Sequence, residues 1–575
     1  MKAQPKTQPV TGGDVVVMKA QPAKQAMTGA EVVVRTLEGR GTKYVFGVPG
    51  AKVDKVFDTL RDSTIQIVVC RHEQNAAFMA GGVGRMTGKA GVTIATSGPG
   101  VSNLVTGLAT ANSEGDPLVA LGGAVSVADR LKSVHQTMDS VGVCKPVTKY
   151  AAEVDSPAST AEVLAAAFRA AESDRPGSAF VSLPIDVMTG EAQCKPIGLS
   201  SFTGQGRAAE ASLSEAVRLI NSAKTPVVFL GLMASKPRAA DAIRAFLNEC
   251  SMPVVGTFQA AGAISQDLFP YYAGRVGQLA NQPADEVLGT ADLVLTIGYD
   301  AVEYWPSLWN KDRDRTIVHV DVVPAAVENN YDPAVELIGS IEETLAALAP
   351  HLHRPSIDGS SKALLSRIAH DREQMRAEAA SLSGIPIHPL RLIAELQDML
   401  TPDVTVCSDM GSFSMYLARY LYSFRARQFL LTNGQQTLGV ALPWAIAATL
   451  VRPQEKVLSI SGDGGFLFSA NELETAVRLK SHLVHMIWID GTYDMVGSQE
   501  LLKYHRVSGV NFGPVDPVKY AEAFGATGLR IDRPDQIGAI LRKAFDTPGP
   551  VLVGVHVDYR QNVKLFKQVY EGSIL

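Results

Sequence analysis

Two aspartates in the last third of the chain lie where two apolar segments end. Asp463 belongs to Gly462-Asp463-Gly464-Gly465, which directly follows the apolar segment 457–460, and Asp490 follows the segment 483–489. In a parallel sheet both ends open on one carboxyl edge, where helix N-termini bind phosphates. Paired carboxylates there suit Mg²⁺, which bridges protein carboxylates and phosphate oxygens. Alone, Asp463 would be interpreted as a helix cap in a tight turn, but its spacing from Asp490 favours a metal site.

A third carboxylate stands near the start of the chain. Glu73 follows the apolar segment 65–70 by three residues, within Arg71-His72-Glu73, and precedes a run of small apolar residues. It is either a solvated helix-start residue stabilised by the macrodipole or a group packed against a buried site. Two turns rich in Gly and Pro follow neighbouring apolar segments, Gly47-Val48-Pro49-Gly50 and Thr96-Ser97-Gly98-Pro99-Gly100. Together with Glu73, these turns favour a ligand site at the carboxyl edge of the sheet that these segments would form.

The elements that must position these residues repeat one pattern three times. Short apolar segments alternate with helical ones, which indicates parallel α/β sheets. We therefore predict three doubly wound parallel-sheet domains of the α/β class. The predicted strands are 44–46, 65–70, 92–96 and 118–121 in the first domain, 227–230, 253–255, 293–297 and 317–320 in the second, and 404–407, 429–431, 457–460 and 483–489 in the third.

Domain boundaries follow from two stretches of weak periodicity, 192–210 and 350–388, which we interpret as linkers. Residues 1–17 are echoed by 18–34 at 11 of 17 positions, and only the second copy runs on into a capping box, Thr28-Gly29-Ala30-Glu31. The predicted parts are a disordered duplicated leader at 1–27, an N-terminal domain at 28–192, a central domain at 209–350, a C-terminal domain at 386–560 and a tail at 561–575.

Composition limits which binding partners and which cellular compartment we expect for this protein. The 575 residues carry a net charge of −5 with scattered basic residues, so we expect no nucleic acid partner. The longest apolar run, 437–451, contains Pro443 and is shorter than the roughly 20 residues that span a bilayer, which predicts a core helix and no membrane segment. Five widely spaced cysteines and the lack of an apolar signal core favour the reducing cytoplasm.

Taken together, these motifs resemble the thiamine diphosphate enzymes of the pyruvate oxidase and acetolactate synthase group, over about residues 28–560. Four further segments resemble the catabolic acetolactate synthases in particular: Gly50-Ala51-Lys52-Val53-Asp54, His135-Gln136, Tyr299-Asp300-Ala301-Val302-Glu303-Tyr304 and Trp488-Ile489-Asp490. The resemblance implies the thiamine diphosphate-binding fold, with thiamine diphosphate and Mg²⁺ as cofactors.

The resemblance also assigns cofactor contacts. Glu73 matches the glutamate that bonds to N1′ of the aminopyrimidine, so that the cofactor itself carries the base. Asp463, Asp490 and the carbonyl of Thr492 match the magnesium ligands, and Asp490 replaces the Asn that is usual at its position. Leu438 matches the apolar wedge that bends the cofactor. The other matched cofactor positions are Pro49, Gly50, Gly411, Ser412, Phe413, Gln436, Gly464 and Gly465.

The implied reaction condenses two pyruvate molecules to 2-acetolactate and CO₂ through a hydroxyethyl-thiamine diphosphate carbanion. Gln136, Met415 and Gln499 match positions that line the substrate pocket, although Gln136 is equally explained as a buried side chain satisfied by backbone groups. Lys52 either faces the anionic substrate or pairs with the neighbouring Asp54. Ser498 is small where relatives carry a larger apolar residue, which predicts a roomier acceptor pocket.

Family organisation places Glu73 and the diphosphate site on different subunits, which implies a homodimer as the minimum unit and a homotetramer as the assembly. Biosynthetic relatives hold a flavin with an Arg-Phe-Asp-Asp-Arg type segment, whereas this chain has Gly298-Tyr299-Asp300 onward, so no flavin is expected. The alternatives are another thiamine diphosphate-dependent 2-keto acid decarboxylase, a flavin-containing biosynthetic acetohydroxyacid synthase and a non-catalytic nucleotide-binding scaffold. The lack of a G-x-G-x-x-G in strand-to-helix context counts against a dehydrogenase.

Overall fold

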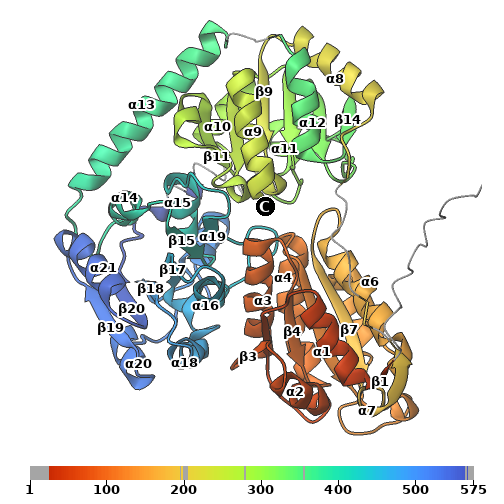
Figure 1. Ribbon diagram of the computed structural model, residues 1–575. Coiled ribbons are helices and arrows are strands. Elements are labelled where there is room, and N and C mark those ends of the chain that lie inside the picture. The colour runs from red at the N-terminus through yellow and green to blue at the C-terminus, as the bar shows by residue number, and fades with distance from the viewer. Residues whose placement is uncertain are drawn as a thin grey trace, which may run out of the picture.

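Three six-stranded parallel sheets organise the chain, one in each of three domains (Figure 1). The computed structural model describes residues 25–194, 196–197, 205–277, 280–353, 357–563 and 566–567. Apolar clusters cover both faces of each sheet, so each sheet has helices packed on its two sides. The predicted class, three parallel-sheet α/β domains, is confirmed.

The N-terminal domain has short strands at both edges of its sheet. Strand order is β3 (Gln66–Val69), β2 (Tyr44–Gly47), β4 (Gly91–Ala95), β5 (Leu118–Ala124), β7 (Ser178–Pro184) and β6 (Tyr150–Glu153). The longest strands, β5 and β7, lie toward the middle. The helices are α1 (Gly29–Gly39), α2 (Asp54–Arg61), α3 (Glu73–Thr87), α4 (Pro99–Ser113), α5 (Ser140–Cys144), α6 (Thr160–Glu172) and α7 (Ile185–Thr189).

The first helix begins where the capping box predicts. Thr28 caps α1, its hydroxyl accepting from the Glu31 amide at 3.2 Å while the Glu31 carboxylate accepts from the Thr28 amide at 2.7 Å. Just before it, β1 (Gln25–Thr28) pairs antiparallel with β8 (Glu191–Cys194), so the end of the segment 1–27 that we predicted as a disordered leader forms a strand. Residues 1–24 of that leader lie outside the described residues.

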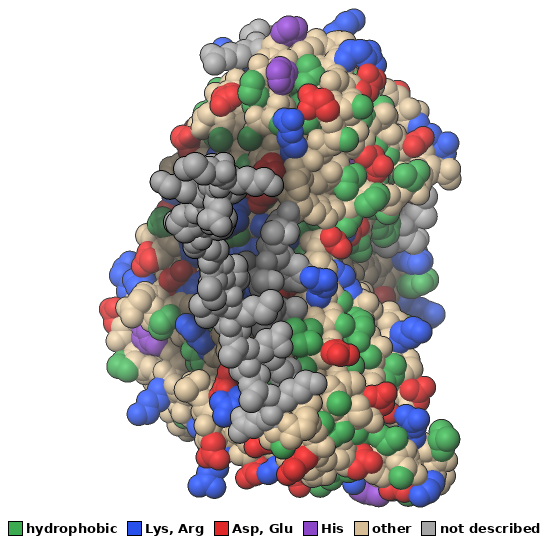
Figure 2. All heavy atoms as spheres, turned by 45° about the vertical axis from the view of Figure 1, so that its right-hand side comes forward, with side chains coloured by type: hydrophobic (Ala, Val, Ile, Leu, Met, Phe, Trp, Pro, Cys, Tyr) green, Lys and Arg blue, Asp and Glu red, His purple; other side chains and the backbone are tan. Residues whose placement is uncertain are grey.

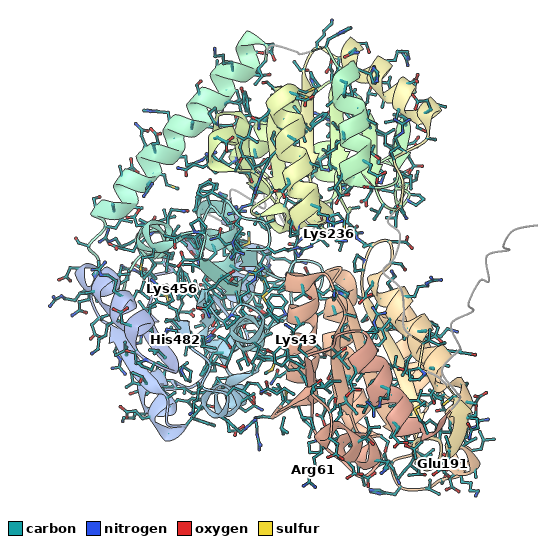
Figure 3. The ribbon with its side chains drawn as sticks, viewed as in Figure 1. Lys43, Arg61, Glu191, Lys236, Lys456 and His482 are labelled. Atoms are coloured by element: carbon teal, nitrogen blue, oxygen red, sulfur yellow. The ribbon has the colours of Figure 1, made fainter. Side chains whose placement is uncertain are left out.

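The central domain has the strand order β11 (Tyr272–Val276), β10 (Val254–Thr257), β9 (Pro226–Leu230), β12 (Leu293–Ile297), β13 (Thr316–Asp321) and β14 (Val335–Ile338). Its helices are α8 (Glu210–Ser222), α9 (Pro237–Glu249), α10 (Pro283–Thr290), α11 (Pro306–Trp309) and α12 (Ile341–Leu348). Lys236 caps α9 at the end of this domain that faces the other two (Figure 3). The carboxyl ends of the central strands therefore lie toward the junction of the three domains.

A long helix leads from the central to the C-terminal domain. This helix, α13 (Gly359–Ser381), runs along the outside of the molecule within the predicted linker 350–388 (Figure 1). The C-terminal sheet has the order β16 (Phe429–Leu430), β15 (Val404–Ser408), β17 (Lys456–Gly462), β18 (Leu483–Ile489), β20 (Pro550–His556) and β19 (Thr527–Ile531). Its helices are α14 (Pro389–Met399), α15 (Ser412–Tyr420), α16 (Ala441–Val451), α17 (Asp463–Phe466), α18 (Leu473–Arg478), α19 (Asp494–Tyr504), α20 (Pro517–Ala523) and α21 (Ile537–Asp546).

The N- and C-terminal domains share one hydrophobic core. Helix α3 lies against α16, and residues of both belong to a single buried cluster. Gly82 makes this approach possible, because a Cβ there would lie 2.8 Å from Trp444 Cδ1. The Arg85 guanidinium stacks over the Trp444 ring, 4.5 Å from its centroid. The two domains are thus packed as one unit.

The apolar run 437–451 is only partly helical. Helix α16 begins at Ala441, and the four preceding residues form the end of a loop in which Gly439 has φ +85°. Within the described part of the chain, no helix combines the length and apolarity that a membrane crossing needs. On the face drawn in Figure 2, basic and acidic side chains are interspersed, which agrees with the scattered charges of the sequence.

Candidate active site

A cavity of about 230 Å³ opens at the carboxyl edge of the C-terminal sheet. Its walls come from the segments that follow β15, β17, β18 and β20, from the loop before α16 and from α19. Eleven residues that we predicted for cofactor, metal or substrate line it: Gly411, Ser412, Phe413, Gln436, Leu438, Asp463, Gly464, Gly465, Asp490, Thr492 and Gln499. Residues far apart in the sequence meet here because parallel strands end at one edge.

Asp463 and Asp490 lie side by side in this cavity. Asp463 Oδ2 accepts from the Gly491 amide at 2.9 Å, and Asp490 Oδ2 accepts from the Thr492 hydroxyl at 2.6 Å. Burial raises the pKa of both carboxyl groups, and burial together with the charge of Asp463 raises that of Asp490 to about 7. Two like charges in a half-buried site are stabilised by a cation between them. The pair therefore fits Mg²⁺, whose remaining ligands would be phosphate oxygens and water.

The turn around Asp463 is tight. Its Oδ1 accepts from the Gly464 amide at 3.1 Å, as a simple turn cap would, but the bond to Gly491 ties the same carboxylate to the next strand. A Cβ on Gly464 would lie 2.6 Å from the Tyr493 ring, and one on Gly465 would lie 3.0 Å from Asp409 Oδ2. These glycines bring bare backbone to the cavity wall, where amide groups can face a phosphate.

Sequence reasoning did not find Asp494 and Tyr559, which line the cavity, or Asn562, which bonds to Asp494. Asp494 accepts from Ser412 Oγ at 2.5 Å and from Asn562 Nδ2 at 2.6 Å, and burial raises its pKa. Asn562 belongs to the segment predicted as a tail, and Tyr416 donates to its Oδ1 at 2.6 Å. Tyr559 lines the cavity with a buried hydroxyl that has no partner among the described residues. The only sequence signal was for Asp494, which stands two residues after Thr492.

The predicted residues of the N-terminal domain gather at the edge of their own sheet. Asn103 Nδ2 donates to Glu73 Oε2 at 3.0 Å, and Glu73 is the first residue of α3. Gln136 has φ +63°, and its Oε1 accepts from Ser97 Oγ at 3.1 Å. The backbone amide of Lys52 lies 3.4 Å from Thr96 Oγ1.

Two alternatives can be compared with these contacts. Among the described residues, the Gln136 side chain bonds to Ser97 and not to a backbone group. Asp54 forms no ion pair with Lys52 in the part of the chain that the structure describes. Pro49 is exposed on the same turn as Gly50, whose added Cβ would lie 2.5 Å from Thr96 Cβ. The structure therefore brings Pro49, Gly50, Lys52, Glu73 and Gln136 to one edge of one sheet.

This N-terminal group does not reach the cavity of the same chain. All the described residues that line the cavity come from the C-terminal domain. Met415, predicted to line the substrate pocket, is buried against Phe566 and Met495 and is not among the lining residues. Ser498, predicted to enlarge the pocket, is buried and also absent from the wall. The neighbours of Ser498 on α19, Val496 and Gln499, face the cavity instead.

Comparison with known proteins agrees with this architecture. Residues 27–143 match the thiamine pyrophosphate enzyme N-terminal TPP binding domain, residues 213–348 the central domain and residues 409–555 the C-terminal TPP binding domain. The chain is 51% identical to a catabolic acetolactate synthase of Raoultella terrigena over 94% of this chain and 96% of that one.

Two further relatives carry related names. An acetolactate synthase of Bacillus subtilis strain 168 is 48% identical over 92% of both chains. An acetolactate synthase isozyme 2 large subunit of Escherichia coli K12 is 31% identical over 92% of this chain and 95% of its own. The paired carboxylates of the cavity lie within the matched C-terminal TPP binding domain, and the similarity to the relatives extends over almost the full length of the chain. The chain therefore belongs to the acetolactate synthases among the thiamine pyrophosphate enzymes.

Proposed function

We propose that this protein condenses two pyruvate molecules to 2-acetolactate with release of CO₂, using thiamine diphosphate and Mg²⁺. The observation that carries the proposal is the cavity in which Asp463 and Asp490 lie together with Gln436 and Leu438. The relatives named as acetolactate synthases cover more than nine tenths of the chain, which supports the same activity. Thiamine diphosphate supplies a reactive carbon and an electron sink for decarboxylation.

The residues of this chain would bind and orient the reactants. Asp463, Asp490 and the Thr492 carbonyl hold Mg²⁺, and the backbone of Gly464 and Gly465 faces the diphosphate. Leu438 and Gln436 hold the pyrimidine end. Glu73 would share a proton with the pyrimidine nitrogen, and Asn103, which donates to Glu73 Oε2, fixes the orientation of that carboxylate. Gln499 lines the cavity and would contact the substrate from its wall.

We propose that each active site is built from two copies of the chain, as a homodimer within a homotetramer. Glu73 and Gln136 lie outside the cavity of their own chain, so a second copy must bring them to it. Exposed apolar side chains surround the cavity, which supports a protein surface as its cover: Tyr493 is 37% exposed, Val496 47% and Phe468 50%.

Mixing two inactive variants tests this assembly. Glu73→Gln and Asp463→Asn should each abolish the consumption of pyruvate, because each removes one half of every site. Mixed dimers of the two variants contain one site with both lesions and one with none, so co-expression should restore about a quarter of wild-type activity. If both halves belonged to a single chain, every site would keep one lesion and the mixture would stay inactive.

We propose that the central domain works without a flavin. The ends of β9 and β12 pack on each other, since a Cβ on Gly231 would lie 2.4 Å from Tyr299 Cα. Glu303 fills the same edge and accepts from the Leu232 amide at 2.9 Å. A purified protein that absorbs at about 450 nm, where a bound flavin is yellow, would contradict this proposal.

We propose that the protein lies in the cytoplasm, as its cysteines favour. The five cysteines are all free thiols and all buried. Reducing conditions keep such thiols unpaired. Fractionation of the source cells, with the enzyme assayed in each fraction, tests the compartment.

The products formed from pyruvate test the reaction itself. We expect acetolactate and CO₂ only when both thiamine diphosphate and Mg²⁺ are added. Acetaldehyde as the main product would instead identify a simple decarboxylase. The Glu73→Gln variant, purified with the same fold by circular dichroism, should lose the reaction, and its survival at the wild-type rate would overturn the assignment of Glu73.

A further inference from the structure

The segment that carries Gln436 and Leu438 has no regular structure of its own. It connects β16, which ends at Leu430, to α16, which starts at Ala441. Gln436 has φ +49°, which is rare for a residue with a side chain, and Gly439 has φ +85°, which favours glycine. Such a backbone persists only where its surroundings hold it. Contacts at the two ends of this segment therefore decide where its side chains point.

The first end is held by a carboxylate of the N-terminal domain. Glu114 is fully buried at the end of α4, and its Oε1 accepts from the Asn433 amide at 2.8 Å and the Gly434 amide at 2.9 Å. The Thr432 hydroxyl donates to the same oxygen at 3.0 Å. Its Oε2 accepts from Arg85 at 3.2 Å and from Gln259 of the central domain. Donors from all three domains thus meet at Glu114.

The second end is held by a carboxylate of the C-terminal domain. Asp409 follows β15, is 1% exposed and accepts from the Gly439 amide at 2.9 Å through each of its oxygens. Its Oδ1 also accepts from the Met410 amide at 2.9 Å. Burial raises the pKa of Asp409 to about 7, while bonds from backbone amides and the position of Asp409 at the start of α16 favour its ionised form. Asp409 also borders Gly465 of the cavity wall.

We propose that Glu114 and Asp409 are positioning residues which together hold the Asn433–Gly439 segment in the shape that places Gln436 and Leu438 against the pyrimidine half of the cofactor. This inference rests on the proposed function for the roles of Gln436 and Leu438. Charge-assisted bonds to backbone amides are about twice as strong as neutral ones, so carboxylates suit this task. An amide side chain fits worse, because the two oxygens of Glu114 face different donors and the NH₂ group of an amide in place of Asp409 would lie beside the Gly439 amide.

Isosteric variants test the positioning role. Glu114→Gln and Asp409→Asn each turn an NH₂ group toward a buried donor, while Asp321→Asn makes the same change at a buried carboxylate of the central domain that does not touch the segment. Binding is measured by calorimetry with two probes in the presence of Mg²⁺: thiamine diphosphate and inorganic pyrophosphate. Pyrophosphate has no pyrimidine ring and reports on the metal and diphosphate subsite alone.

The variants should weaken the binding of thiamine diphosphate, which carries the pyrimidine ring, and not the binding of pyrophosphate. We expect Glu114→Gln and Asp409→Asn to weaken thiamine diphosphate binding about tenfold or more, since a buried donor is left unsatisfied. Pyrophosphate binding should stay within about twofold of wild type for these variants, and Asp321→Asn should change neither affinity by more than about twofold. Equal losses for both probes, or no loss for either, would overturn the positioning role.

A milder variant covers the case in which the isosteric variants fail to fold. Thr432→Val removes one donor to Glu114 and the acceptor of the Thr437 amide at 3.4 Å, while the other donors to Glu114 stay paired. It should weaken thiamine diphosphate binding several-fold with pyrophosphate unchanged, and an unchanged affinity for both probes counts against the proposal. Wild-type protein is measured first, because failure of the wild type to bind thiamine diphosphate would refute the proposed function and not the positioning role.

Discussion

Asp490 places a second negative charge beside Asp463 where Asn is usual in the resembled enzymes, and its carboxyl group has a pKa raised to about 7. We expect Asp490→Asn to lower the affinity for Mg²⁺ about tenfold, because the charge of the ligand set tunes affinity for hard cations. The same change should raise the thermal midpoint of the metal-free protein, since it removes a repulsion between like charges. Melting curves with and without Mg²⁺ measure both effects. A metal-free midpoint that falls would contradict this account.

Tyr559 offers a hydroxyl without a partner in the described part of the cavity. Tyr559→Phe should leave the stability of the cofactor-free protein unchanged or slightly higher, because removing an unsatisfied buried group costs nothing. If the hydroxyl bonds to a ligand in the cavity, the apparent KM for pyruvate or the dissociation constant of the cofactor should rise several-fold. Tyr416→Phe is the matched control, since its hydroxyl is already bonded to Asn562 and its loss should lower stability.

Individual site residues differ in how well the sequence predicts them. Asp463, Asp490 and Gly464 stand directly after apolar strands, so the strand pattern alone brings them to one edge. Tyr559 and Asn562 come from a segment after the last strand that has no motif, and only the folded chain places Tyr559 in the cavity wall and Asn562 against Asp494. Met415 and Ser498 stay predictions, since they are buried beside the cavity wall of a single chain and the sequence does not say which side of a helix faces the cavity.

At the scale of elements, the end of β9 and the turn after β12 meet around the buried Glu303. Burial raises its pKa to about 8 from an ordinary 4.5, against the lowering effects of Thr257, the Leu232 amide and Arg175, while Asp300 raises it. The folded protein therefore binds more protons than the unfolded chain between pH 4.5 and about 8, and stability falls as pH rises through this window.

A neutral isostere should remove this pH dependence. Relative to wild type, Glu303→Gln should melt at a higher temperature at pH 8.5 than at pH 6, so the difference between the two midpoints becomes more positive as pH rises. Thermal denaturation followed by circular dichroism at the two pH values gives the comparison. The control Glu162→Gln changes an exposed carboxylate, and its melting temperature should differ from that of wild type by the same amount at both pH values. A pH-independent difference for Glu303→Gln would refute the buried, protonated carboxyl group.

The strand pattern predicts buried central strands best. The predicted strands 293–297 and 483–489 match β12 and β18 residue for residue. Edge strands such as β14 and β19 were missed because their side chains are mostly half-exposed and lack an apolar run. β7 was missed although it is fully buried, because Ser178 and Ser182 interrupt its apolar pattern and satisfy their hydroxyls inside the domain.

On the scale of the whole molecule, the sequence indicates three domains in order but not how they pack. The contact between α3 and α16 joins residues more than 350 positions apart, and no local pattern records it. Helix α13 likewise appears in the sequence as a charged helical piece of a linker. Its course between two domains depends on contacts such as the Arg372 guanidinium, which lies 4.9 Å from the Phe269 ring centroid.

Filling the contact between the two domains should destabilise both. Gly82→Val would drive a side chain into Trp444, and overpacking of this kind costs about 1–3 kcal/mol in the free energy of unfolding. Gly39→Val is a suitable control, because a Cβ there meets nothing within 4 Å. Hydrogen exchange should show faster opening of strands in the N- and C-terminal sheets alike for Gly82→Val. Protection lost in only one sheet would contradict a shared core.

The shared core also constrains how such a chain can change over generations. The small-residue face of α3 fits the Trp444 face of α16. A recombination event that replaced only the first domain would therefore bring together two helix surfaces that do not fit each other. Exchange of the first and last domains as a pair would preserve the fit. Substitutions in α3 should therefore be accompanied by substitutions in α16 when related lineages are compared, even though an entire domain separates the two helices in the gene.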